Sequence, residues 1–401
     1  MFTIRVLHFN SFEEAEAEIF LMTGDRPEAA RLARAVYPAS LKLDVIPKAV
    51  ADAVNTAWTS QGGKVLSGEF GLPAGTSDLF LDGNLAKWTE LVRRLQESAE
   101  DLGNPEIRTL GVELKEVLQN YEGKKSYAIN CRGRSLTVGR RTLIMGILNV
   151  TPDSFSDGGR WTDIDAALDH AQRMIEDGAD IIDVGGESTR PGHIPVSLDE
   201  ELRRVLPVVE RLASSVEVPI SVDTSKAQVA RRALEAGAHI INDVWGLHAD
   251  PEMAEVAARF AAPVIIMHNK DKPLYRSLMA EISLYFKETV SLAEKAGVKR
   301  EKIILDPGLG FAKNAEHNLE VTRRLRELAG LGFPILIGPS RKNTIGKVLN
   351  MPVDQRVEGT AAMVAAGIIN GADIIRVHDV KEMTRVARMT DAIRRGLASS
   401  V

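Results

Sequence analysis

The chain of 401 residues contains a single cysteine, Cys131. One cysteine excludes an intrachain disulfide and a cysteine-rich metal site, so we interpret Cys131 as a partly buried small residue. No uninterrupted apolar run reaches membrane-spanning length. The N-terminus lacks the basic start, apolar centre and small-residue cleavage site of a signal peptide. These absences predict a cytoplasmic protein with no membrane partner.

An excess of positive charge is also missing. The chain has 50 Lys and Arg residues against 55 Asp and Glu residues, which gives a net charge of −5. That balance gives no general reason to expect nucleic acid as a partner. Hydrophobic residues make up 44% of the chain, which is enough for one large core and a smaller one.

Short apolar runs recur between residues 142 and 397. Most are rich in β-branched residues and lack polar alternation, which is typical of strands buried on both faces. Stretches with one apolar helical face lie between them, at 165–176, 201–213 and 227–236. The predicted strands cover residues 143–148, 181–184, 220–222, 239–241, 264–267, 303–305, 335–337 and 374–377.

Eight strand–helix units in about 250 residues predict a (β/α)8 TIM barrel. Three stretches, at 177–180, 236–239 and 370–373, place a glycine at a helix end that leads directly into a strand. An open doubly wound sheet is the alternative, but it would more often carry a glycine-rich phosphate turn after the first strand, which is missing here. A hairpin at 127–136, with its turn at 131–134, is predicted to close the bottom of the barrel.

The first 125 residues differ from the rest and predict an additional small α/β domain. A polar segment at 119–125 is typical of a linker, so we divide the chain into residues 1–125 and 126–401. The first region shows no metal, phosphate or nucleophile motif, so we favour a packing, dimerisation or regulatory role over the alternative of a second catalytic activity. Its predicted strands are 3–9, 64–66 and 79–81, and its predicted helices are 12–22, 50–59 and 85–95.

Polar side chains stand at the predicted carboxyl ends of the barrel strands, where barrel enzymes bind their ligands. Any one of them alone is compatible with a helix cap, as Asp223 is with the following Thr224 and Ser225. Six strand ends that converge on one mouth predict a binding site. The strand-end residues are Asn149, Asp223, Asn242, Asp243, Asp306, Ser340, Arg341, Lys342, Arg376 and His378.

Arg376 and His378 occupy alternate positions of one predicted strand, so they face the same side. With Asn149 they form a candidate anion site, because the planar fork of arginine can bind two oxygens of a phosphate.

Two segments carry a family resemblance: 145–159, which reads MGILNVTPDSFSDGG, and 185–192, which reads GGESTRPG. They resemble signatures of the dihydropteroate synthases, which join a pterin to p-aminobenzoate in folate biosynthesis. The resemblance covers the chain from about residue 127 onward. Its later blocks lie at 221–224, 241–243, 305–308, 340–342 and 376–379.

The resemblance implies a role for each matched residue at the pterin. Asp223, Asn242 and Asp306 would read the ring, with Lys342 beside them, because a carboxylate accepts two N–H groups and an amide satisfies a mixed edge. Four residues would supply apolar contact around the ring. For Ile147, ordinary packing in the barrel core is an equally good explanation. The four residues are Ile147, Val244, Met267 and Phe311.

The family pattern also implies a pyrophosphate site at Asn149, Arg376 and His378, with Arg376 stacking on the pterin. Asn149 matches the contact to Mg²⁺, which would be held mainly by pyrophosphate oxygens and water. The p-aminobenzoate pocket would contain Ser340 and Phe311, as well as residues of two loops that order over the site as a lid. The loop residues are Asp153, Asp157, Thr189, Arg190 and Pro191.

The implied reaction is a substitution in which dihydropterin pyrophosphate loses pyrophosphate and the aniline nitrogen of p-aminobenzoate attacks the cationic methylene. No protein nucleophile is needed, and no G-x-S-x-G or Cys–His arrangement is found. The resemblance also implies a homodimer. Three departures stand out: Leu309 where the family often has phenylalanine, Asn343 where serine is common, and an unusual sequence at 267–270.

Two other functions are compatible with part of the pattern. A pterin-dependent methyltransferase, which passes a methyl group to a corrinoid protein, would explain Asp223, Asn242 and Asp306. It would not explain the polar residues of 149–157 or 340–342. A pterin-binding paralogue without catalytic activity is the other alternative, for which the intact anion site is unfavourable.

Overall fold

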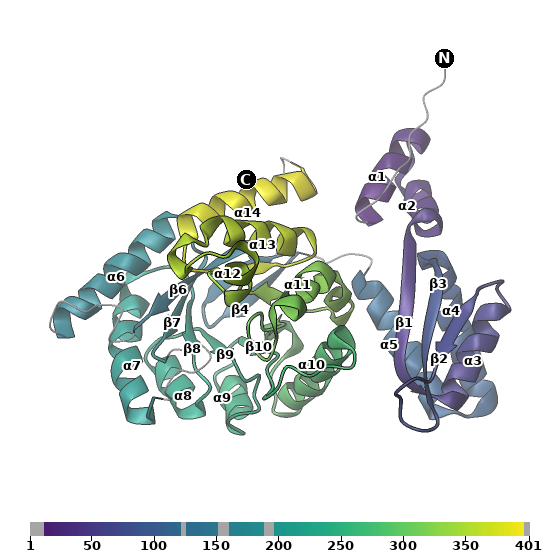
Figure 1. The fold of residues 1–401 in the computed structure, drawn as a ribbon, viewed down its shortest axis with the longest axis horizontal. Coiled ribbons are helices and arrows are strands. Elements are labelled where there is room, and N and C mark those ends of the chain that lie inside the picture. The colour runs from purple at the N-terminus through teal and green to yellow at the C-terminus, as the bar shows by residue number, and fades with distance from the viewer. Residues whose placement is uncertain (1–11, 122–125, 151–159, 188–195, 397–401) are drawn as a thin grey trace, which may run out of the picture. The chain divides into compact units, whose positions relative to one another are not determined.

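The computed structural model describes residues 12–121, 126–150, 160–187 and 196–396, shown as a coloured ribbon in Figure 1. The chain divides into two compact units, Met1–Lys124 and Lys125–Val401. None of the described helices is long and apolar enough to cross a membrane.

The second unit is a closed barrel of eight parallel strands surrounded by helices, which confirms the predicted (β/α)8 fold (Figure 1). The sheet order is β11-β10-β9-β8-β7-β6-β13-β12. It closes where Leu305 N donates to Pro334 O at 2.9 Å, next to a parallel bridge between Leu305 and Ile335. The strands are β6 (Leu143–Asn149), β7 (Ile181–Gly185), β8 (Ile220–Asp223), β9 (Ile240–Asp243), β10 (Val264–Met267), β11 (Ile303–Asp306), β12 (Leu336–Ile337) and β13 (Ile374–Val377).

Most strands run at least one residue further toward the mouth than the apolar pattern predicts. The prediction at 239–241 is wrong at both ends, because His239 precedes the strand and its Nδ1 accepts a hydrogen bond from Ile220 N at 3.2 Å. Polar residues such as Asn149, Asp223 and Asp306 are therefore the last rungs of the ladder rather than the start of loops. That rigid placement fixes where their side chains leave the backbone.

Local signals set the helix ends. Ser197 accepts a hydrogen bond from Glu200 N and begins α7. Gly178, Gly237 and Gly371 have φ of 106°, 110° and 107°, which confirms the predicted glycine stops. The helices are α6 (Arg160–Glu176), α7 (Leu198–Ser215), α8 (Ala227–Glu235), α9 (Met253–Arg259), α10 (Leu278–Lys295), α11 (Ala315–Arg324), α12 (Asn343–Leu349), α13 (Val357–Ile369) and α14 (Val380–Arg395), with short 3-10 turns η2 (Arg300–Lys302), η3 (Leu325–Leu331) and η4 (Val353–Gln355).

The predicted hairpin is present as β4 (Tyr127–Cys131) and β5 (Arg134–Val138). Its two turn residues, Arg132 and Gly133, both have positive φ, which suits a tight two-residue hairpin. Ile129, Cys131 and Leu136 are buried in one apolar cluster with the amino ends of the barrel strands, so the hairpin closes the bottom of the barrel as predicted.

The first unit is a small α/β fold with a three-stranded antiparallel sheet of order β1-β3-β2. Trp58 and Trp88 stack at its centre with ring centroids 4.2 Å apart, and a Cβ on Gly63 would lie 2.2 Å from the Trp58 ring. The strand predicted at 3–9 lies outside the described residues. The elements are α1 (Phe12–Thr23), α2 (Arg26–Val36), β1 (Pro38–Pro47), α3 (Lys48–Thr59), β2 (Val65–Gly68), β3 (Thr76–Asn84), α4 (Leu85–Leu102) and α5 (Pro105–Tyr121).

Candidate active site

An arginine and two aspartates meet inside the carboxyl mouth of the barrel. Arg376 on β13 donates from Nε to Asp183 Oδ2 and from Nη2 to Asp223 Oδ2, both at 2.6 Å. Asp183 is fully buried and Asp223 is 5% exposed. Asn242 Nδ2 adds a third donor at 3.2 Å from Asp183 Oδ2. Arg376 therefore links Asp223 to Asp183, and Asp183 links Arg376 to Asn242, although Asp183 itself was not predicted from the sequence.

Within the part of the chain that the structure describes, the second oxygen of each aspartate has no hydrogen-bond partner. Oδ1 of Asp183 and Oδ1 of Asp223 are buried without a hydrogen bond among the described residues. A buried acceptor without a donor costs about 1–3 kcal/mol, and more when it is charged. Burial raises the pKa of Asp223 to about 7, although the positive charge of Arg376 opposes the shift. The mouth therefore presents acceptors that suit a ligand rich in N–H groups.

Asp306 lies at the end of β11 and belongs to a tight turn. Its Oδ1 accepts a hydrogen bond from Gly308 N at 2.7 Å, and burial raises its pKa to about 6. Gly308 has φ of 72°, and a Cβ there would lie 2.2 Å from His268 O. The positive φ and the close contact with His268 O require glycine at position 308. The hydrogen bond from its N–H to Asp306 Oδ1 accounts for the spacing of two residues between them.

Lys342 and Phe311 form a second part of the mouth. The Lys342 ammonium lies 4.3 Å from the centroid of the Phe311 ring, within the range of a cation–π contact. A Cβ on Gly310 would lie 2.9 Å from Lys342 Cδ, so the glycine leaves room for the lysine stem. Two residues that the resemblance places at the substrates are therefore in direct contact.

Ser340 orients the predicted anion-binding histidine. Its Oγ accepts a hydrogen bond from His378 N at 3.2 Å and lies 3.0 Å from His378 Nδ1. Ser340 is buried, and its hydroxyl contacts both the backbone and the ring of His378.

Asn149 stands at the end of β6 opposite Gly185. A Cβ on Gly185 would lie 3.8 Å from Asn149 Oδ1 and 3.5 Å from Asp223 Cβ, so the glycine keeps the space between the two side chains open.

The residues predicted to make apolar contact around the ring include Met267, which is buried at the end of β10, and the buried Ile147 and Val244.

Two strand-end residues have ordinary structural partners. Asp243 accepts hydrogen bonds from Trp245 N at 2.9 Å and Leu247 N at 2.8 Å, so both its oxygens hold a turn. Arg341, with φ of 56°, forms a two-pronged contact with Asp379 at 2.5 and 3.1 Å. Neither contact reaches the Arg376 cluster.

The departures from the family pattern lie in different surroundings. Leu309 is 2% exposed and packs in the barrel core. Asn343 is exposed, and its Oδ1 lies 3.4 Å from Arg356 Nη1. The loop residues Asp153, Asp157, Thr189, Arg190 and Pro191 lie outside the described residues.

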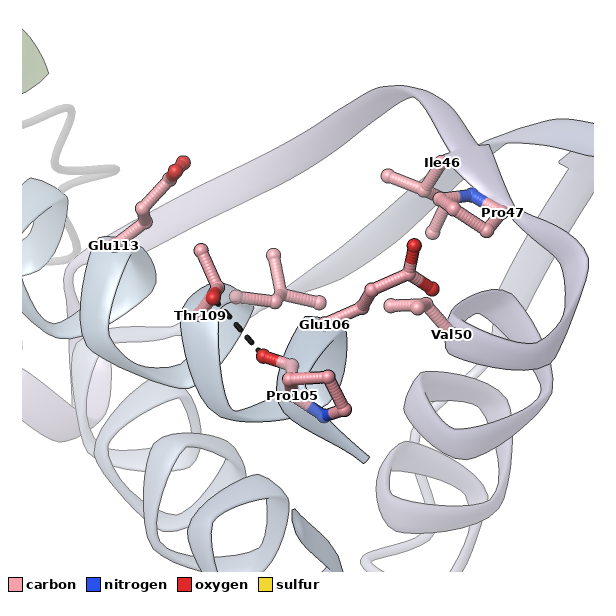
Figure 2. A pocket seen from close by; sticks show the side chains of 8 residues that line it. Ile46, Pro47, Val50, Pro105, Glu106, Thr109 and Glu113 are labelled. Carbon is pink, nitrogen blue, oxygen red and sulfur yellow. Dashed lines mark hydrogen bonds between the residues drawn. The ribbon is translucent and has the colours of Figure 1, made fainter. Parts of the chain in front are cut away.

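The first unit has a cavity of about 310 Å³ between the start of α3 and α5 (Figure 2). Thr109 Oγ1 donates to Pro105 O at 2.9 Å, a contact drawn in Figure 2. The other lining side chains are apolar or acidic. The lining residues are Ile46, Pro47, Val50, Pro105, Glu106, Thr109, Leu110 and Glu113.

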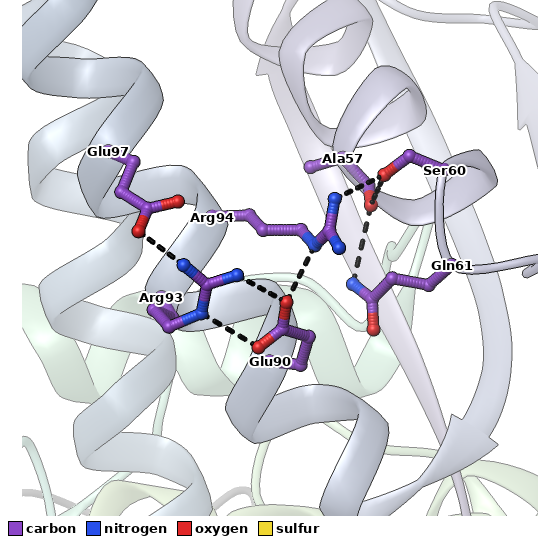
Figure 3. A network of polar contacts seen from close by, with 7 residues as sticks. All are labelled: Ala57, Ser60, Gln61, Glu90, Arg93, Arg94 and Glu97. Carbon is purple, nitrogen blue, oxygen red and sulfur yellow. Dashed lines mark hydrogen bonds and ion pairs between the residues drawn. The ribbon is translucent and has the colours of Figure 1, made fainter.

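The first unit has a network of ion pairs that is largely exposed, unlike the buried cluster around Arg376. On α4, Arg93 bridges Glu90 and Glu97, and Arg94 joins Glu90 to Ser60 (Figure 3). These ion pairs between neighbouring turns are largely exposed, and such pairs contribute little to stability. They give no reason to place chemistry on this face.

Comparison with known proteins identifies relatives of the second unit. Residues 145–378, more than half of the chain, match the model of the family described as pterin binding enzyme. The dihydropteroate synthase of Clostridium beijerinckii is 53% identical over 263 residues, which cover 65% of this chain and 98% of that protein.

Two solved structures extend the comparison. A dihydropteroate synthase from Clostridium difficile, crystallised in the presence of pteroic acid, is 56% identical with a TM-score of 0.63, covering 64% of this chain and 98% of that one. The Xanthomonas albilineans dihydropteroate synthase with 4-aminobenzoic acid is 42% identical with a TM-score of 0.65, covering 68% and 99%. Each of these structures matches about two thirds of this chain.

Proposed function

The chain belongs to the pterin binding enzyme family and acts as a dihydropteroate synthase of folate biosynthesis, and we propose that the Arg376 cluster is the centre of its active site. The enzyme is a transferase that joins a dihydropterin carried on pyrophosphate to p-aminobenzoate. Relatives that match along nearly their whole length are synthases, which favours this reaction over methyl transfer or binding alone.

One observation carries the assignment of the site: two buried carboxylates share one arginine, and each keeps an oxygen to which no described residue donates. A pterin ring presents N–H donors along its amidine-like edge, so it supplies what these oxygens lack. Asp223 and Asn242 then read the ring from neighbouring strands. Asp183 serves both of them by holding Arg376 and the Asn242 amide in place.

Asp306 faces the same ring from β11. Its carboxylate stabilises the positive charge that develops on the pterin methylene as pyrophosphate departs. The charges of Lys342, Lys313 and Arg376 favour its ionised form against the effect of burial. The carboxylate is thus prepared before the substrate arrives, which avoids reorganisation during the reaction.

Pyrophosphate is bound by Arg376, His378 and Asn149. Two of the five N–H groups of Arg376 are engaged by the aspartates, which leaves three for phosphate oxygens. A single amide oxygen, that of Asn149, suits a Mg²⁺ ion that takes its other ligands from pyrophosphate and water. When bound, Mg²⁺ offsets the negative charge that collects on the leaving pyrophosphate.

The second substrate, p-aminobenzoate, is positioned by Phe311, Ser340 and Lys342. The carbon–oxygen bond to pyrophosphate breaks with its electron pair on oxygen, the aniline nitrogen forms the new bond to the methylene carbon, and that nitrogen then loses a proton. Positioning and electrostatics account for such a reaction without a protein nucleophile.

The loop residues Asp153, Asp157, Thr189, Arg190 and Pro191 would complete the site over the bound substrates. A cytoplasmic homodimer is the expected state, and sedimentation of the purified chain tests the dimer. A protein that sediments as a monomer at micromolar concentration would remove that part of the proposal.

The function is tested by pyrophosphate release from the purified protein with dihydropterin pyrophosphate, Mg²⁺ and p-aminobenzoate, each omitted in turn. The expected result is release that needs all three, with dihydropteroate formed in equal amount. A folded protein that binds pterin but releases no pyrophosphate would contradict the synthase assignment, and methyl transfer would then be tested.

A further inference from the structure

A lysine is buried directly behind the Asp306 turn. Lys313 is 9% exposed, and its ammonium meets three acceptors: His268 Nδ1 at 2.9 Å, Phe311 O at 3.1 Å and Gly308 O at 3.2 Å. An ammonium has three N–H donors and no acceptor, so this set matches the charged form. A buried charge is costly, and an apolar side chain of similar volume would fill the space without that cost. The lysine therefore calls for a reason other than packing.

His268 is the neutral partner in this arrangement. Burial and the neighbouring Lys313 charge lower the pKa of His268 to about 3, so its Nδ1 accepts from the lysine and its Nε2 carries the proton. The backbone of His268 donates to Asp306 O at 2.8 Å. Through this histidine the lysine ties the end of β10 to the end of β11.

The Lys313 ammonium also holds the Gly308–Phe311 turn, which follows Asp306. Gly308 donates its N–H to the Asp306 carboxylate and accepts from Lys313 through its carbonyl oxygen. Phe311 N donates to Gly308 O at 3.1 Å, and Phe311 O accepts from Lys313. The Phe311 ring in turn contacts the Lys342 ammonium. Lys313 therefore positions both the Asp306 carboxylate on the pterin side and Phe311 on the p-aminobenzoate side of the mouth.

Charge adds to the geometry. Burial raises the pKa of Asp306 to about 6, while the Gly308 N–H, Lys342, Lys313 and Arg376 oppose the rise. Burial lowers the pKa of Lys313 to about 7, the Asp306 charge opposes this shift, and Lys270 and Lys342 add to it. His268 faces Lys313 in its neutral form, and the rings of Tyr275 and Tyr285 lie against that histidine.

We propose that Lys313 is a positioning residue of the pterin site, which holds the Gly308–Phe311 turn in place and supplies a positive charge that keeps Asp306 ionised. The inference rests on the proposed function, in which Asp306 stabilises the cationic pterin. Lys313 touches neither substrate, so its effect is transmitted through the turn and the carboxylate.

The test compares Lys313→Met with Lys270→Met in the full chain. Lys270 is a matched control because it also carries a positive charge near His268, but it bonds to Leu274 O and Glu281 instead of the turn. The measurements are kcat/KM for dihydropterin pyrophosphate across pH, and calorimetric binding of 6-hydroxymethylpterin at several pH values.

In Lys313→Met the acid limb of kcat/KM should move to higher pH by about one unit, because Asp306 loses a stabilising charge. Pterin binding should weaken most at pH values near the Asp306 pKa of about 6 and recover toward alkaline pH. Lys313→Arg keeps the charge and should retain the wild-type position of the limb. Lys270→Met should leave the profile unmoved.

A uniform loss at every pH, with the acid limb unmoved, would show a purely structural role and overturn the proposal. If Lys313→Met does not fold, Lys313→Gln provides the same comparison with one amide donor retained. If neither variant folds, the lysine is a determinant of folding and the proposal is wrong. Binding is measured apart from turnover, so a wild-type chain that binds pterin without releasing pyrophosphate would refute the function and leave this comparison intact.

Discussion

The two ends of the barrel are built by the same eight strands and have opposite chemistry. At the amino end, Ile181, Ile240 and Ile304 pack with Ile129 of the hairpin in a fully buried apolar cluster. At the carboxyl end, the strands carry carboxylates, amides and Arg376, and each of the two aspartates bound to Arg376 keeps one oxygen without a donor among the described residues. The difference shows how one fold separates stability from function: one end is satisfied without a ligand, and the other is not.

The largest expected effect is at the polar end. Arg376→Ala removes the shared partner of Asp183 and Asp223 and the fork proposed for pyrophosphate, so kcat/KM should fall about 10²–10³-fold. Circular dichroism checks that the variant is folded, and Arg376→Lys is the control that keeps the charge without the two-pronged geometry. Near-normal kcat in a folded Arg376→Ala variant would remove Arg376 from the site.

The matching change at the apolar end is Ile129→Ala. Ile129 is fully buried, so the cavity should cost about 2–5 kcal/mol of unfolding free energy, measured by urea denaturation. The specific activity of the folded protein should stay at the wild-type level, because no substrate contact is changed. A loss of kcat without a loss of stability would contradict the separation of the two ends.

A smaller effect concerns pH. Burial raises the pKa of Asp223 to about 7 from an ordinary value of 3.8, so between these values the folded chain binds more protons than the unfolded chain. Its contribution to the unfolding free energy therefore falls as pH rises through this range. In the Asp223→Asn variant, the unfolding free energy measured by urea denaturation should fall less steeply between pH 4 and 7 than in the wild type. An unchanged slope would show that Asp223 is ionised throughout, as it is in the unfolded chain.

The smallest effect is expected in the first unit. Glu97→Gln removes an exposed partner of Arg93, whose other carboxylate contact, to Glu90, remains. No measurable change in melting temperature or kcat is expected, because exposed ion pairs contribute little. A clear loss of activity would show that this surface communicates with the barrel site.

The sequence predicts the fold well because the barrel strands are local apolar runs. Val264–Met267 and Ile374–Val377 agree with prediction at both ends. The ten-residue strand Pro38–Pro47 was missed, although Leu41 and Leu43 alternate with Lys42 and thus give a period-two signal. The helices α2 and α5 were missed as well, although α2 begins at the Asp25 cap with a proline in its first turn.

The candidate site is predicted where its residues stand at strand ends or in recognisable family segments. Asp183 lies inside a strand that reads as buried core, and its partner Arg376 is 193 residues away, so no local pattern connects them. A carboxylate within an otherwise apolar strand is the signal that points to it. Lys313 was missed for a related reason, since its three acceptors are set by the folded turn and not by its neighbours in sequence.

The most direct test of this account is the equilibrium binding of 6-hydroxymethylpterin to the wild-type chain and to two variants, one from each end of the barrel. Asp223→Asn should weaken binding by about tenfold or more, since it replaces one acceptor oxygen with an NH2 group that faces the ring's own N–H groups. Ile129→Val should leave the dissociation constant unchanged. Equal binding by the wild-type and Asp223→Asn proteins would contradict the claim that the polar mouth reads the pterin.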